Sequence, residues 1–435
     1  MPAAALCGIF AAVLFPLAAT AADPPPPISA GFEEPDFALG NVHDRQGWTV
    51  ESGVAEVTNE EAHSGKCSLK LFAASPFAQA RLRLASAAPP HTVTFVDGWV
   101  RPVAVAPADD AEMLDIDGAR LGVFRIEGDP ASAEVWLFDA RGGGMAGAWV
   151  RTAARLPVDP KSGRSAKWMR VTLREDFLRQ AWDCWIDGTW VAANLGFHEP
   201  HVSHTENYVI MGDAARDVFL DDLAIDARNP FGVDSDLDGF LDADEKKWGW
   251  NPWFDDRDAD ANRDGTPNLD EAITRLAKTE SAPIRGTSAP PPGAPFFSRP
   301  GGIVSGPVEL GLGTDQPGKL RLVYTLDGSD PRLAPSRAAV YETPLQINTS
   351  CVVRAAVLDE AQRASSVITA AFVFPAQIAT HQGVQVSTVR TQLRAIRHKT
   401  ASDSMRELMQ KVSTLPPLAR YLPSFLSSTD SGIAV

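Results

Sequence analysis

The sequence predicts an all-β protein built from two antiparallel sandwiches, and three features carry that prediction. Residues 28–230 form short runs in which apolar and polar residues alternate, with Gly, Asp and Pro between the runs, a pattern typical of antiparallel strands. Residues 231–275 are acidic and punctuated by glycine. After a linker rich in Pro, Gly and Ser over 276–293, residues 294–375 return to short alternating runs.

The composition narrows the class of protein. The 435-residue chain has 40 Lys and Arg against 55 Asp and Glu, a net charge of −15, which argues against a nucleic-acid partner. Hydrophobic residues make up 44% and charged residues 22%, as in ordinary globular domains, so the chain is not disordered throughout. Because only one long apolar run occurs, a membrane protein with several spans is excluded.

That apolar run opens the chain and predicts export. Residues 1–22 are apolar and end in small residues before a run of four prolines, which is typical of a secretory signal peptide. An uncleaved anchor is the alternative, and Pro16 argues against it because proline breaks a spanning helix. We therefore expect a protein that is secreted or held at the cell envelope, with no membrane span after signal cleavage.

Signal cleavage would determine which cysteines remain in the exported chain. Cys7 would leave with the signal, and Cys67, Cys184 and Cys351 would remain, so one intrachain bridge at most can form. Cys67 and Cys184 lie in the same predicted domain and either pair or remain buried thiols. Since no C-x-x-C pattern occurs, a zinc site is not expected.

Residues 28–230 resemble a known fold family. The runs GFEEPDFALG, EEAHSGKCSLKL, WMRVTLREDFLRQAWDCWIDGTWV and FLDDLAID are similar to concanavalin-A-like or laminin-G-like jelly rolls. The resemblance implies an antiparallel jelly-roll sandwich. Because Trp99, Trp136 and Trp168 sit in apolar alternating runs, we expect them in its core.

Two twelve-residue stretches of the acidic segment have the spacing of a calcium-binding loop. Such a loop places oxygen ligands at positions one, three, five, seven, nine and twelve, and a glycine at position six. In loop one, DSDLDGFLDADE, the ligand positions hold Asp234, Asp236, Asp238, Phe240 (through its carbonyl), Asp242 and Glu245. In loop two, DANRDGTPNLDE, they hold Asp260, Asn262, Asp264, Thr266, Asn268 and Glu271.

The two matches predict Ca²⁺ as the cofactor. Their close spacing, with WGWNPW between them, resembles thrombospondin type 3 or dockerin loops more than a paired EF-hand domain, which implies little flanking helix. Loop one has five carboxylates, whereas loop two has three and also Arg263, so we expect loop one to bind more tightly. A solvated acidic linker is the alternative interpretation.

The C-terminal module carries the most specific fold resemblance. PFFSRPGG, YTLDGSDP and VRAAVLD are similar to the chitobiase/β-hexosaminidase C-terminal domain, which implies a small immunoglobulin-like sandwich over residues 294–375. Strand alternation predicts that Leu320, Leu322, Tyr324 and Leu326 point inward. Residues 376–435 are predicted to be a helical or disordered tail, whose end resembles the segment ahead of the catalytic fold in CotH-type proteins.

The sequence contains no tight catalytic motif. In EMLDIDG, Asp115 and Asp117 share a face of the predicted strand, but their spacing departs from the carboxylate pattern of glycosidases. In HEPHVSH, His198, His201 and His204 either converge on a transition metal or lie in a polar surface loop. No catalytic residue is assigned.

These features predict an exported, non-catalytic, calcium-binding modular protein. We expect it to be glycan-binding or adhesive, with polysaccharide or an envelope glycan as its partner. A glycoside hydrolase with its active site in the jelly roll is one alternative. A structural spacer, or a truncated CotH-type relative, is the other.

Overall fold

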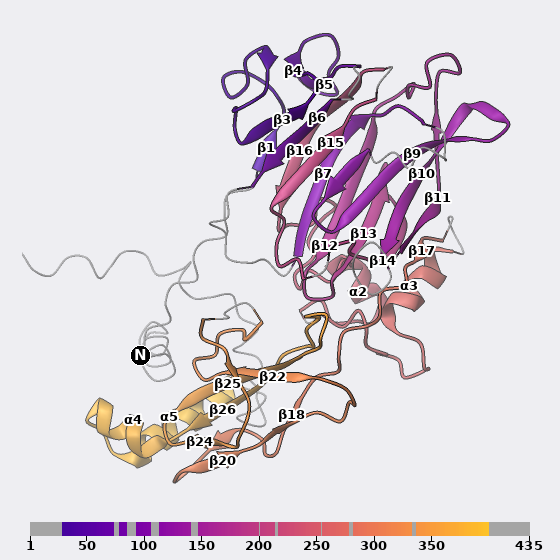
Figure 1. Ribbon diagram of the computed structural model, residues 1–435. Coiled ribbons are helices and arrows are strands. Elements are labelled where there is room, and N and C mark those ends of the chain that lie inside the picture. The colour runs from indigo at the N-terminus through magenta and orange to yellow at the C-terminus, as the bar shows by residue number, and fades with distance from the viewer. Residues whose placement is uncertain are drawn as a thin grey trace, which may run out of the picture. The chain divides into compact units, whose positions relative to one another are not determined.

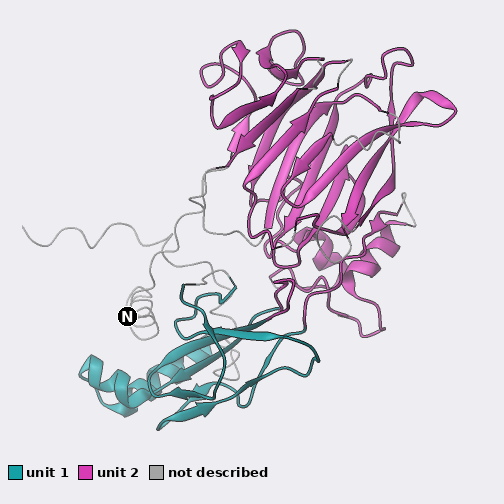
Figure 2. Ribbon diagram, in the orientation of Figure 1, with its two compact units in different colours: residues 1–23, 293–357, 366–435 teal, residues 24–292, 358–365 magenta. Residues whose placement is uncertain are grey.

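The computed structural model describes residues 28–73, 78–84, 93–105, 113–140, 147–199, 201–213, 216–253, 255–277, 282–332 and 336–399. The chain divides into two compact units (Figure 2). One unit contains residues 24–292 and 358–365, and the other contains 293–357 and 366–435 together with the first 23 residues. The predicted signal at 1–22 and the end of the tail lie outside the described residues.

Two antiparallel sheets stack face to face in the first unit (Figure 1). The larger sheet has ten strands: β1 (Ile28–Ala30), β2 (Gly40–Asn41), β4 (Ala55–Thr58), β5 (Ser68–Leu71), β7 (Val93–Arg101), β12 (Met169–Asp176), β13 (Ala181–Ile186), β14 (Thr189–Gly196), β16 (Val218–Asp226) and β17 (Ile284–Arg285). Their order is β17-β14-β13-β12-β7-β16-β5-β4-β2, with β1 beside β16. Only β17 pairs in parallel with its neighbour in this sheet, among the described residues.

The second sheet of this unit has seven strands: β3 (Trp48–Ser52), β6 (Gln79–Arg83), β8 (Leu114–Ile116), β9 (Ala119–Ile126), β10 (Asp129–Ala140), β11 (Gly147–Pro157) and β15 (Asn207–Met211). They run in the order β11-β10-β9-β8-β15-β6-β3, and every pair is antiparallel. The predicted all-β sandwich is therefore confirmed.

One hydrophobic core fills the space between the sheets, and strand alternation explains its membership. On β10, Val135 and Leu137 are fully buried in this core, so Trp136 between them faces outward. The prediction that Trp99, Trp136 and Trp168 lie in the core is wrong, because all three are only partly buried. Alternation shows which residues share a face, but it does not show which face is inward.

The acidic segment belongs to the first unit and packs on the sandwich. Loop one leads into α2 (Asp242–Trp248) and loop two into α3 (Asn268–Leu276), and both helices lie at the end of the sandwich that carries β12, β13 and β14 (Figure 1). Phe240, Trp250 and Leu269 form a second core cluster with Trp185 and Trp190 from β13 and β14. Each loop is thus followed by one short helix, and burial of these aromatic rings holds the segment in place.

The second unit is a smaller β-structure. It contains β18 (Phe296–Phe297), β19 (Gly302–Ile303), β20 (Val308–Leu310), β21 (Leu312–Gly313), β22 (Arg321–Thr325), β23 (Ala339–Val340), β24 (Leu345–Ile347), β25 (Cys351–Leu358) and β26 (Ile368–Val373). Five of these strands form a sheet in the order β19-β26-β25-β22-β23, and the pairs β18-β21 and β20-β24 complete it.

The inward face of β22 differs in part from the prediction. Val323 and Thr325 are buried, whereas Tyr324 and Leu322 are half-buried against the core, and Leu326 is exposed. Beyond β26, α4 (Pro375–Gln382) and α5 (Val386–Lys399) bury Ile378 and other apolar residues against β25 and β26. The predicted tail is therefore helical and packed as far as the description extends.

The sequence left two alternatives open: whether Cys67 and Cys184 pair, and whether a helix spans a membrane. Cys67, Cys184 and Cys351 are free thiols, so Cys67 and Cys184 do not pair. Burial raises the pKa of the Cys184 thiol, which makes it unreactive. Within the described ranges, none of the helices has both the length and the apolar character that crossing a bilayer requires.

Candidate metal centre

The two loops fold with the same backbone. Glycine at position six has a positive φ in both, 99° at Gly239 and 93° at Gly265, a conformation that favours glycine. The position-six amide donates to the position-one carboxylate in each loop, at 3.2 Å in loop one and 2.8 Å in loop two. The position-seven amide donates to the position-five carboxylate at 2.8 Å in both. The predicted spacing therefore builds one loop geometry twice.

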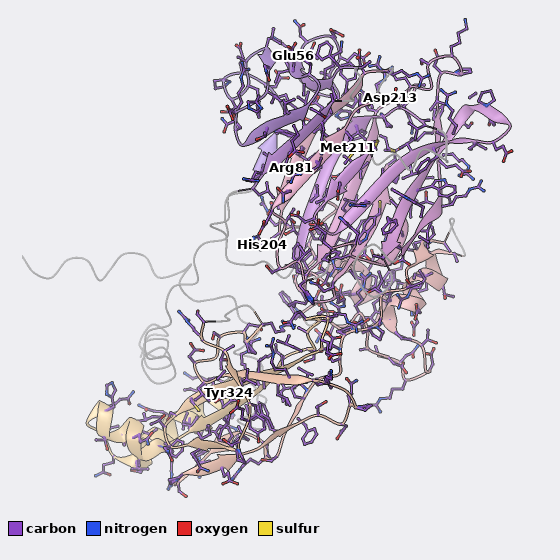
Figure 3. The ribbon with its side chains drawn as sticks, viewed as in Figure 1. Glu56, Arg81, His204, Met211, Asp213 and Tyr324 are labelled. Carbon is purple, nitrogen blue, oxygen red and sulfur yellow. The ribbon has the colours of Figure 1, made fainter. Side chains whose placement is uncertain are left out.

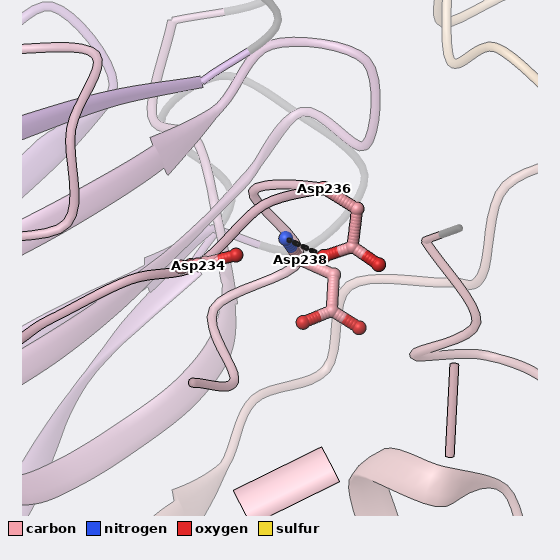
Figure 4. Close-up of side chains that lie close together, drawn as sticks. All are labelled: Asp234, Asp236 and Asp238. Carbon is pink, nitrogen blue, oxygen red and sulfur yellow. Dashed lines mark hydrogen bonds between the residues drawn. The ribbon is translucent and has the colours of Figure 1, made fainter. Parts of the chain in front are cut away.

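Loop one collects carboxylate oxygens that have no partner. Asp234, Asp236 and Asp238 each bring a ligand atom within 4.8 Å of the others (Figure 4). Asp238 and Glu245 are completely buried. One oxygen of each of the three aspartates and both oxygens of Glu245 are buried without a hydrogen bond. Because a buried polar group without a partner is costly, this arrangement fits a bound cation.

A residue outside the loop joins this group. Asp256 brings an oxygen within 4.8 Å of ligand atoms of Asp238 and Glu245. The Asn251 amide holds one oxygen of Asp256, and the Asn268 side chain donates to the other at 2.9 Å. No pattern in the sequence indicates Asp256 as a ligand, because it lies eleven positions after the end of the loop and approaches the loop only when the acidic segment folds.

The pKa values of these carboxyl groups reflect their burial and their close spacing. Burial, followed by repulsion from Glu245 and other carboxylates, raises the pKa of Asp236 to about 8. Burial and then Asp238 raise the pKa of Glu245 to about 8. Burial also raises the pKa of Asp238 and of Asp256. Burial and mutual repulsion therefore disfavour the charged form of these carboxyl groups in the absence of a cation.

Two buried arginines of the first unit hold the backbone of loop one. Arg174 of β12 donates to the Leu237 carbonyl at 2.6 Å, and Arg257 donates to the Asp238 carbonyl at 2.8 Å. Both guanidinium groups also pair with the buried Asp183 of β13, at 3.2 and 2.7 Å. Arg174 of the sandwich and Arg257 of the acidic segment therefore hold the backbone turn of loop one.

The side chain at position nine makes hydrogen bonds within its own loop in both loops. The two oxygens of Asp242 accept from the backbone amide and hydroxyl of Ser235. In loop two, Asn268 accepts from the Ala261 amide at 3.2 Å. Each position-nine side chain thus closes its own loop, and Asp242 belongs to neither metal-holding group of the described residues. At position seven, the backbone amides of Phe240 and Thr266 donate hydrogen bonds to the position-five carboxylates.

Loop two is exposed, and its own side chains use its ligand atoms. Glu271 accepts from Arg275 at 2.6 Å and from the Asn262 amide at 2.5 Å. Asn262 also donates to Asp264, whose pKa is lowered by the Thr266 amide and then by Asn262. In the described part of the chain, the ligand atoms of Asp260, Asp264 and Glu271 do not converge as a metal-holding group.

The histidine cluster does not converge on a metal. His198 is buried with Nε2 at 3.2 Å from Asp115, and His204 pairs with Glu206 at 3.2 Å. Neither metal-holding group of the described residues includes a histidine. Asp117 accepts from the Asn207 backbone and side chain and from the Glu206 amide. This leaves the polar-loop interpretation of HEPHVSH.

One part of the chain matches a known protein family. Residues 310–372 match the family described as Fn3 associated, within the predicted C-terminal module. The resemblances to chitobiase and CotH-type proteins stay predictions. No curated protein matches the chain.

Solved structures similar to the chain include the CBM22-1 xylan-binding domain from Paenibacillus barcinonensis Xyn10C, with 20% identity over 46% of this chain and 92% of that one and a TM-score of 0.22. The cellulose-induced protein Cip1 has 12% identity, covers 46% and 96%, and has a TM-score of 0.28. The binding domain of botulinum neurotoxin DC has 9% identity, covers 76% and 72%, and has a TM-score of 0.28. At these values the similarities assign no function to this chain.

Proposed function

We propose that the chain is an exported, non-catalytic protein that binds calcium through loop one and glycans through its first unit. One observation carries the calcium part: five carboxylate oxygens of Asp234, Asp236, Asp238 and Glu245 are buried without a partner. Negative groups repel one another at this separation, and a divalent cation removes the repulsion. The predicted ligands at positions one, three, five and twelve, with Asp256 added, would hold the ion.

The donor set favours calcium among common cations. All the converging atoms are carboxylate oxygens, whereas zinc and copper sites draw on imidazole or thiolate. Calcium accepts six to eight oxygens in flexible geometry, while magnesium demands a near-ideal octahedron and retains several waters. A twelve-residue loop that supplies several carboxylates therefore suits calcium better than magnesium.

Calcium would have a structural role here. The same turn that carries the carboxylates is held by Arg174 and Arg257, and Phe240 of loop one lies in the core cluster with Trp190. A bound ion would therefore stabilise the packing of the acidic segment on β13 and β14. Limited proteolysis of the full chain tests this: cleavage within 231–275 should be faster with chelator than with millimolar calcium. Equal cleavage in both would contradict the proposal.

Glycan binding is supported by the outer face of the seven-stranded sheet. Trp136 and Trp149 lie on neighbouring strands, partly exposed, and both contact Phe124, with ring centroids 5.4 and 5.7 Å apart. Aromatic side chains with one exposed face suit flat, amphipathic ligands such as sugar rings.

A glycan array tests this second part. Wild-type protein should bind a polysaccharide without releasing product, and Trp136→Ala should lose that binding. Trp253→Ala, which removes a tryptophan that is 60% exposed in the acidic segment, is the matched control and should bind normally. Release of reducing ends would favour the glycoside hydrolase instead, and silence in both assays would leave a structural spacer.

A further inference from the structure

A polar cavity of about 320 Å³ opens on the outer face of the seven-stranded sheet. Val209 of β15 lies opposite both Asp115 of β8 and Arg81 of β6 in the strand register, so these three side chains form one row across the sheet. The loop that precedes β15 closes the cavity on one side. Its lining includes Arg81, Asp115, Asp117, Glu199, His204 and Glu206, of which Arg81 and His204 are labelled in Figure 3.

The charge of this cavity is strongly negative. Four carboxylates line it, and the charge of Arg81 is already matched by Glu51 of β3, with Nε 2.6 Å from the carboxylate. Arg120 reaches Asp115 at 3.5 Å. These five acids and two bases leave a net charge of three negative units. Burial, and then repulsion from Asp117 and Asp115, raises the pKa of Glu199, as expected for an uncompensated negative field.

A buried histidine, His198, lies beside two of the carboxylates that line the cavity. His198 is 3% exposed, and neither of its ring nitrogens makes a hydrogen bond. Its Nε2 lies 3.2 Å from an oxygen of Asp115 and 3.7 Å from one of Glu199, and both of these residues line the cavity. Burial lowers the pKa of His198, although Asp115 beside the ring opposes this shift, so the geometry places a buried imidazole directly behind two carboxylates of the cavity.

An ammonium group satisfies this arrangement. It donates three hydrogen bonds and carries one positive charge, so it pairs with the carboxylates that the protein leaves unbalanced. The cavity volume lies at the lower end of the range of about 300–1,000 Å³ for ligand pockets, which gives room for one sugar unit. A neutral sugar would leave the charge of Glu199 uncompensated, whereas Asp115 already pairs with Arg120.

We propose that this cavity binds the protonated amine of an amino sugar, so that the preferred glycan of the first unit carries free amines. This inference rests on the proposed glycan binding. It assigns the cavity to a cationic saccharide and the aromatic residues Trp136 and Trp149 to the neighbouring part of the same face.

Calorimetry with the full chain in saturating calcium tests the inference. A glucosamine tetramer should bind at least tenfold more tightly than an N-acetylglucosamine tetramer of the same length, because acetylation removes the charge. The affinity should fall as salt is raised. Glu199→Gln should lower the affinity for the glucosamine tetramer several-fold without changing the melting temperature. Glu56→Gln, on β4 of the other sheet, is the control and should leave that affinity unchanged (Figure 3).

The outcomes separate this inference from the proposed function. Equal affinity for the two tetramers, or binding that Glu199→Gln leaves unchanged, would overturn the amine site. Binding of only neutral glycans on the array would overturn it as well, while glycan binding itself would stand. If no glycan of either kind bound, both proposals would fail.

Discussion

Loop one and loop two share the glycine turn and the hydrogen bonds of the position-six and position-seven amides, yet in the described part of the chain only loop one has the surroundings of a metal centre. In loop one, Glu245 is completely buried with both oxygens unpartnered. In loop two, Glu271 at the same position is paired with Arg275 and Asn262. The spacing of a loop therefore determines the positions of its candidate ligands, whereas the neighbouring residues determine whether the carboxylates are already paired or need a cation.

The largest expected difference concerns the arginines beside the two loops. Arg257 is buried and pairs with the buried Asp183 at 2.7 Å, so Arg257→Met breaks a buried ion pair and should cost about 3–5 kcal/mol of unfolding free energy. Arg275 is 37% exposed in its pair with Glu271, so Arg275→Met should cost about 0–1 kcal/mol. Urea unfolding of both variants in calcium measures this. Equal losses would mean that loop one is not held by the sandwich.

Removal of calcium should have the next largest effect. Extracellular sites bind calcium with Kd around 10⁻⁴–10⁻³ M, and a site of ~0.1 mM in ~2 mM calcium adds about 1.8 kcal/mol by mass action. The melting temperature should therefore fall on addition of a calcium chelator and recover when calcium is restored. A melting temperature that ignores both additions would contradict a folded-state calcium site.

A smaller effect is expected at Asp256. Asp256→Asn removes one charge from the group around Glu245 and keeps an oxygen for the Asn268 contact, so we expect loop-one affinity to fall about tenfold, or about 1.4 kcal/mol. Asp270→Asn is the control, because Asp270 pairs with Arg285 at 2.8 Å on the exposed side of α3. Calcium titration of both variants provides the measurement. An unchanged affinity in Asp256→Asn would confine the site to the twelve-residue loop.

The sequence predicts local features well and packing poorly. Alternation predicted the sandwich, and spacing predicted Gly239 and Gly265 at the turns, because both depend on neighbours in the chain. Asp256 was missed because the contact with Asp238 and Glu245 exists only after the acidic segment packs on the sandwich.

The same limit explains the error in assigning core residues. Trp99 and Trp136 satisfy the alternation of a strand but face outward, because the pattern does not give the side on which the second sheet lies.

The central claim is that loop one is the calcium site and binds the ion more tightly than loop two does. Calcium titration calorimetry of Asp238→Asn against Asp264→Asn tests it most directly, since both change position five and both keep the oxygen that accepts the position-seven amide. Asp238→Asn should abolish the tighter binding event, and Asp264→Asn should leave it within about twofold. Loss of the tighter event in Asp264→Asn, with Asp238→Asn unchanged, would contradict the account.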